Sequence, residues 1–141
     1  MRTATTVALG LAIVSMLGCG GTSTNPNDRV VDTTTSASWS VAFTPGLDPS
    51  ACGLTVNLGF SGQTINVDKA SSAFHDVWSP TTPNLMKADG TLTSSGLTAT
   101  LTCISTSGTG SMTGTPNGAE YAGTATLSGK TVAIRVTKVT F

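Results

Sequence analysis

Charged side chains are scarce in this 141-residue chain: they make up 10% of it, with seven basic residues against seven acidic ones. Soluble domains usually carry about a quarter. The composition therefore argues against a nucleic-acid partner, which needs a basic stripe, and against an acidic tail. Aromatic residues are also few, at 5%, and there is a single histidine. Such a surface offers little to a strongly charged ligand.

The chain has one extended apolar run, from Val7 to Leu17, and the only charge before it is Arg2. A membrane-spanning helix needs about 20 apolar residues, so this run is too short to span. Its length is typical of the core of a signal peptide. The run is followed directly by Gly18 and Cys19. The order of basic start, apolar run and Gly-Cys predicts export.

This order resembles a bacterial lipoprotein signal with its lipobox. The resemblance implies that residues 1–18 are removed and that Cys19 carries lipid on its sulfur and an acyl chain on its amino group. Several acyl chains anchor a protein firmly, whereas one holds it weakly. Gly20, rather than Asp, follows the cysteine, which by the sorting rule of enteric bacteria implies the outer membrane. The alternative is an ordinary secretory signal and a freely exported protein.

The chain contains three cysteines, so lipidation of Cys19 leaves Cys52 and Cys103 as one pair. Each falls on the apolar phase of a predicted strand, and two cysteines that face one core can approach within bridging distance. We expect a disulfide between them, because exported proteins meet an oxidising compartment. Two separate buried thiols are the alternative.

Residues 19–36 are polar and without periodicity, which predicts a flexible tether. From residue 37 to 141 apolar and polar residues alternate with a period of two, which predicts strands of a single β domain. The clearest alternating segments are 39–43, 52–60, 97–103, 121–127 and 131–137, and the weaker ones are 65–67, 86–92 and 111–113. In the last segment the alternation changes phase after Val136, which predicts either a bulge near Thr137 or an end that leaves the core before Lys138.

Glycine-containing pairs typical of tight hairpins stand between many of these segments: Asp89-Gly90, Asn117-Gly118 and Ser128-Gly129. Strands joined so closely must be antiparallel. We predict an all-β fold, an antiparallel sandwich or a small barrel of seven or eight strands. The early Trp39 is loosely similar to the first strand of lipocalins and avidins, at the level of architecture only.

One segment departs from the period-two alternation that predicts strands. Asp68 is placed as an N-cap, and Phe74 and Trp78 are four residues apart. This spacing predicts one short amphipathic helix near residues 69–78. The connection offers Phe74, His75 and Trp78 as a candidate ligand surface, because binding sites favour long loops on rigid scaffolds. The competing interpretation is that Phe74 and Trp78 close one end of the core.

The chemistry available to this chain is limited. The adjacent His75 and Asp76 would point apart on a helix, and no nucleophile motif accompanies them. One histidine and two bridged cysteines cannot supply an ordinary zinc site, so we expect no metal and no cofactor. The sequence favours a non-enzymatic binding or structural module of the cell envelope, with a glycan, an apolar molecule or another envelope protein as partner. The alternative is a small hydrolase that uses His75 with a carboxylate.

Overall fold

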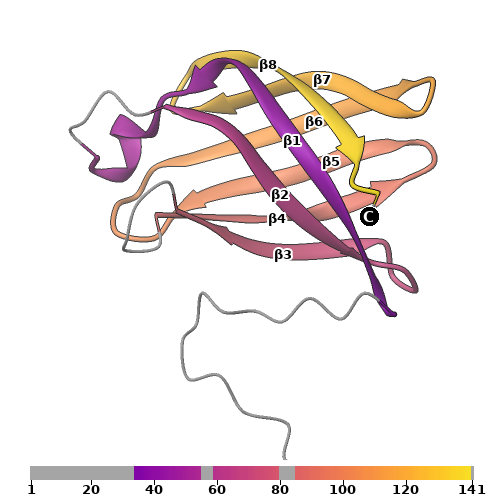
Figure 1. Cartoon of the computed structure of the whole chain (residues 1–141). Coiled ribbons are helices and arrows are strands. Elements are labelled where there is room, and N and C mark those ends of the chain that lie inside the picture. The colour runs from indigo at the N-terminus through magenta and orange to yellow at the C-terminus, as the bar shows by residue number, and fades with distance from the viewer. Residues whose placement is uncertain (1–33, 55–58, 80–84, 141) are drawn as a thin grey trace, which may run out of the picture.

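The computed structural model describes residues 34–54, 59–79 and 85–140. They form eight antiparallel strands in one nearly closed, barrel-like sheet (Figure 1). The all-β prediction is therefore confirmed, in its barrel form. The strands are β1 (Ser36–Leu47), β2 (Phe60–Asp68), β3 (Ala73–Trp78), β4 (Met86–Thr93), β5 (Gly96–Cys103), β6 (Thr109–Asn117), β7 (Glu120–Leu127) and β8 (Lys130–Lys138), and a short 3-10 helix, η1, covers Pro49–Cys52.

The strands follow one another around the sheet in the order β2-β1-β8-β7-β6-β5-β4-β3. Each strand pairs with the next one along the chain, with one exception, and β8 returns to pair with β1. The exception is the junction of β2 and β3, the two edge strands, which lie side by side without a backbone ladder. We call this junction the seam. The up-and-down order is also that of lipocalins and avidins, a likeness of architecture that carries no function.

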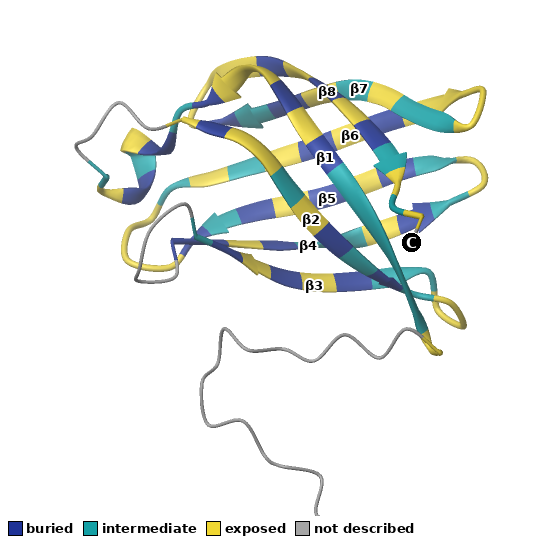
Figure 2. Ribbon diagram, in the orientation of Figure 1, coloured by how far each residue is buried: buried dark blue, intermediate teal, exposed yellow. Residues whose placement is uncertain are grey.

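The interior of the barrel is filled by side chains from every strand. Alternate residues point inward, so buried and exposed positions follow each other along the ribbons in Figure 2. Several inward positions are glycines, and Gly110 and Gly123 are two of them. A Cβ built on Gly110 would lie 2.1 Å from the carbonyl oxygen of Thr126, and one on Gly123 would lie 1.9 Å from that of Thr113. Glycine is required there because neighbouring backbone comes too close for any side chain.

The two ends of the barrel differ. At the end where β1 begins and β8 ends, the connections are residues 69–72, 94–95 and 118–119. We call this the terminal end. At the opposite end, the loop end, the connections are residues 48–59, 79–85, 104–108 and 128–129. The long connections are therefore gathered at the end that lies away from the first residues of β1 (Figure 1).

The predicted helix near residues 69–78 is wrong, because the segment forms a turn followed by strand β3, Ala73–Trp78. Asp68 does cap this turn, since its Oδ1 accepts the backbone N–H groups of Ala70 and Ser71 at 2.9 and 2.7 Å. The sequence pattern does not reveal this strand, because a polar residue occupies one of its inward positions. Asp76 stands between Phe74 and Trp78 on the inward face of the strand. The two apolar residues are therefore four positions apart, which is also the spacing of neighbours on one face of a helix.

Three further expectations need correction. The segment 52–60 is not one strand: Cys52 belongs to η1, β2 begins at Phe60, and residues 55–58 lie outside the described residues. Asp89-Gly90 is not a hairpin but the middle of β4. Gly90 is needed there because a Cβ would lie 2.2 Å from the carbonyl oxygen of Thr98. Of the two alternatives for the last strand, a bulge at Thr137 is wrong, because the register with β1 and β7 is continuous. The other is confirmed, because the strand leaves the core after Val136, before Lys138.

Candidate functional site

The residues proposed as a ligand surface do not share a surface. Phe74 and Trp78 belong to the core, with exposed fractions of 1% and 2%, and only His75 lies outside. The Trp78 ring packs edge-on against Phe43, with ring centroids 5.8 Å apart, and its Nε1 donates to the carbonyl oxygen of Thr64 at 3.1 Å. The interpretation that these aromatic residues fill the core is the one that the structure supports.

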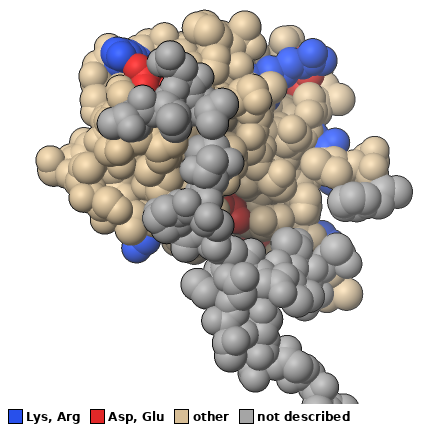
Figure 3. Space-filling view, turned by 60° about the vertical axis from the view of Figure 1, so that its left-hand side comes forward, with Lys and Arg blue, Asp and Glu red and all other residues tan. Residues whose placement is uncertain are grey.

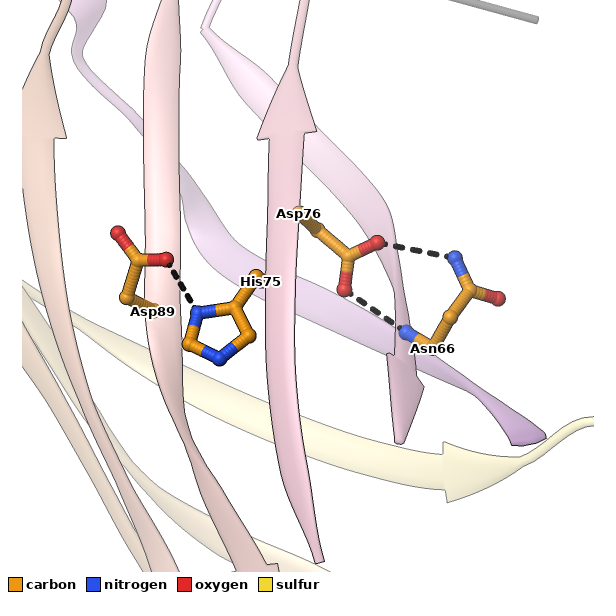
Figure 4. Close-up of polar contacts among 4 residues, drawn as sticks. All are labelled: Asn66, His75, Asp76 and Asp89. Atoms are coloured by element: carbon orange, nitrogen blue, oxygen red, sulfur yellow. Dashed lines mark hydrogen bonds and ion pairs between the residues drawn. The ribbon is translucent and has the colours of Figure 1, made fainter. Parts of the chain in front are cut away.

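His75 has a carboxylate partner on the outside of the barrel. Its Nδ1 lies 2.8 Å from Oδ1 of Asp89, the residue directly opposite on β4. Figure 4 shows this pair on one side of β3 and Asp76 on the other. Sequence alone does not reveal Asp89 as the partner of His75, because the pair is formed across two strands and Asp89-Gly90 has the composition of a tight turn.

The pair is poorly arranged for nucleophilic catalysis. The side chains are 70% and 45% exposed, so water competes for every contact they make. The hydroxyl of Thr100 is in register with Asp89 and not with His75, so the carboxylate separates it from the imidazole. A nucleophile is activated when the imidazole stands between hydroxyl and carboxylate. The observed order supports a surface ion pair.

Asp76 is the only buried charged side chain among the described residues, with an exposed fraction of 6%. Its Oδ2 accepts the backbone N–H of Asn66 on β2 at 2.8 Å, and its Oδ1 accepts the side-chain amide of the same residue at 2.9 Å (Figure 4). Ser38 on β1 donates to Oδ1 of Asn66 at 2.9 Å and orients that amide. A carboxylate on β3 thus serves an edge N–H group of β2 that would otherwise lack a partner.

The loop end carries a disulfide and a pocket. Cys52 in η1 and Cys103 at the end of β5 are joined by the disulfide, with their Cα atoms 5.0 Å apart. Beside it, η1, the 104–108 connection and the β7–β8 hairpin enclose an open pocket of about 470 Å³. The pocket is lined by Asp48, Ser50, Ala51, Thr106, Ser107, Gly108, Thr109, Leu127, Ser128 and Lys130. We call it the loop-end pocket.

The two charged residues of the loop-end pocket neutralise each other. Oδ2 of Asp48 pairs with Nζ of Lys130, and its Oδ1 accepts the backbone N–H of Ser50 at 2.9 Å. The hydrogen bond from Lys130, followed by those from Ser50, lowers the pKa of Asp48 to about 2. No sequence pattern indicates this pair, because its members are 82 residues apart.

The part of the chain that the structure describes offers no group of three or more His, Cys, Asp or Glu that could hold a metal ion. Within the same residues, no helix is long and apolar enough to cross a membrane. Cys19 lies outside the described residues. No protein-family model, curated protein or solved structure matches this chain.

Proposed function

We propose that this chain is a lipid-anchored protein of the cell envelope, in the outer membrane, whose barrel is a non-enzymatic binding or structural module. The observation that carries the proposal is the polarity of the barrel. The chain from Cys19 joins the barrel at the terminal end, and the long connections lie at the opposite end. A lipid on Cys19 would therefore attach the barrel through its terminal end and leave the loop end free of the attachment.

The composition of the molecule supports binding or structure over catalysis. Binding residues are found most often on loops that a rigid scaffold positions, and the disulfide and the filled core provide that scaffold. On the face that Figure 3 shows, the charged side chains of the described residues are few, and in two places basic atoms lie against acidic ones. Partners that fit such a surface are glycans, uncharged molecules or other envelope proteins.

The anchor is tested by membrane fractionation and intact mass. The exported protein should remain with the membrane at high salt and have the mass of residues 19–141 plus three acyl-type chains. Cys19→Ala should abolish the modification and release the protein or trap its precursor. The double variant Cys52→Ala/Cys103→Ala is the matched control, because it removes the other two cysteines and should keep the lipid. An unmodified, soluble mature chain would refute the anchor.

A second candidate, a small hydrolase, is favoured by one observation, the 2.8 Å contact between His75 and Asp89. If the pair activates water, His75→Ala should abolish hydrolysis of a panel of ester and amide substrates by the purified protein. The conservative control is Asp89→Asn, which keeps the shape of the pair and removes the charge. Hydrolysis that is absent, or equal in His75→Ala and in the parent, disposes of this candidate.

A further inference from the structure

The loop-end pocket has the size and the walls of a ligand site. Its volume of about 470 Å³ falls in the range of about 300–1,000 Å³ that small-molecule sites occupy. It is bounded by three separate connections, as ligand sites at the mouth of a barrel commonly are. Its position at the loop end places it on the side of the barrel opposite the first residues of β1.

The lining of the pocket is rich in hydroxyl groups. Ser107, Thr109 and Ser128 are exposed, and their hydroxyls have no hydrogen-bond partner among the described residues. A hydroxyl both donates and accepts, so this wall suits a ligand that also offers both. Ala51, which is partly exposed, adds an apolar contribution.

The pocket has no unpaired charge to attract an ionic ligand. The single negative charge, on Asp48, is paired with the single positive charge, on Lys130. Because the pKa of Asp48 is lowered to about 2, its carboxylate stays ionised throughout the physiological range. The pocket thus presents a fixed acceptor and a fixed donor without a net charge.

The walls are fixed before any ligand arrives. The disulfide ties η1 to β5, and the hydroxyl of Thr106 donates to the carbonyl oxygen of Ala51 at 2.7 Å. Gly108 lies so close to both that an added Cβ would be 2.7 Å from Sγ of Cys103 and 2.9 Å from the Ala51 oxygen. A preformed site binds more tightly because less ordering is required on binding.

We propose that the loop-end pocket binds a neutral carbohydrate. Sugars carry many hydroxyls that donate and accept together, have no net charge, and present C–H groups to apolar contacts, which matches each property of the lining. The proposal rests on the proposed function for the direction in which the pocket faces, and it names the class of partner for that binding module.

The test is calorimetric titration of the intact protein, extracted in a detergent without a sugar headgroup. The probes are neutral di- and trisaccharides of glucose, galactose, mannose and N-acetylglucosamine, with sulfated and uronic-acid forms of the same length. We expect a neutral saccharide to bind, with an affinity that changes little between low and high salt. Ser107→Ala/Thr109→Val should weaken that binding by about tenfold or more, because two hydroxyls are lost.

The matched control is Ser111→Ala/Thr113→Val, which removes two exposed hydroxyls from the same strand β6 outside the pocket and should leave binding unchanged. Binding by charged saccharides alone, by a peptide in place of sugar, or by no saccharide would overturn the proposal. Equal losses in both double variants would also overturn it. Failure to bind sugar in a protein that still requires Cys19 for membrane attachment refutes the pocket and leaves the anchor intact.

Discussion

The seam and the wall opposite it close the same barrel by different means. Across β4 to β8 every neighbouring pair is joined by a continuous backbone ladder, as in the eight residue pairs from Gly110↔Leu127 to Asn117↔Glu120. Between β2 and β3 the hydrogen bonds among the described residues involve side chains: Asp76 accepts two from Asn66, and Trp78 donates one to Thr64. Ladder hydrogen bonds can form with almost any sequence, whereas the seam depends on particular residues. The seam should therefore be the more sensitive of the two regions to substitution.

The buried carboxylate also has a protective effect at the seam. Exposed strand edges invite pairing with other chains, and inward-pointing charges are one way in which natural sheets prevent it. Asp76 satisfies an edge N–H of β2 and places a charge where an invading strand would need to pair. The seam is thus protected from pairing with strands of other chains as well as from solvent.

Removal of the disulfide should have the largest effect, because it links the segment before β2 to the wall strand β5. Cys52 and Cys103 are 51 residues apart, and closing a loop of that size stabilises a fold by about 4 kcal/mol on the chain-entropy model. Cys52→Ala/Cys103→Ala should lower the free energy of unfolding by about this amount, measured by urea denaturation. An equal stability of the parent with and without reductant would contradict the expectation.

Loss of the seam carboxylate should come next. Asp76→Ala leaves the backbone N–H and the side-chain amide of Asn66 without their acceptor, at a cost of about 3 kcal/mol. Thr100→Val on the outside of the wall is the control and should change stability by less than about 0.5 kcal/mol. If the two variants unfold at the same urea concentration, the seam is no more sensitive than the wall.

A smaller effect is expected from Trp78→Phe. The variant loses the hydrogen bond to the Thr64 carbonyl and part of the packing against Phe43, together about 1–2 kcal/mol. Amide hydrogen exchange should locate the loss: protection should fall in β2 and β3 and persist in β6 and β7. Uniform loss of protection over all strands would show that the seam does not open separately.

The smallest effect concerns the exposed carboxylate of the loop end. The pKa of Asp48 is lowered to about 2 from an ordinary 3.8, so its ion pair with Lys130 stabilises the fold above about pH 4 and is lost as the pH falls towards 2. In Lys130→Met the pKa should rise towards its ordinary value, as measured by NMR titration of the carboxyl carbon. A pKa unchanged by that substitution would show that Lys130 is not its main cause.

The sequence predicted several strands with apolar inward positions correctly, although the equally regular segment 52–60 holds part of η1 and only the first residue of β2. The alternation of leucine and threonine from Leu97 to Cys103 identified β5, and the same pattern identified β7 and β8. It failed at β3, because a single inward carboxylate broke the pattern, and an inward carboxylate is explained only by its tertiary partner Asn66. The antiparallel order followed from the turns, but the closure of β8 onto β1 depends on curvature that no local pattern encodes.

The candidate sites show the same limit. Cysteine counting and strand phase pointed to the pair Cys52 and Cys103, although Cys52 lies in a 3-10 turn and not in a strand. The partners of His75 and Asp48 could not be foreseen, because each pair is formed only when two strands or loops distant in the chain meet. Residues of the loop-end pocket are ordinary turn residues in the sequence, and their role depends on three connections that converge.

The double pairing of β1 has a mechanical consequence. β1 runs from the terminal end to the loop end and is held by ladders on both flanks, to β2 and to β8. If a lipid on Cys19 anchors the chain, a force applied to a partner bound at the loop end would be transmitted along the length of this strand. Hydrogen bonds on both flanks would then be loaded in shear and would have to break together, whereas bonds that are peeled apart break one at a time. If Cys19 carries the proposed lipid, the strand that follows the tether is thus suited to bear tension.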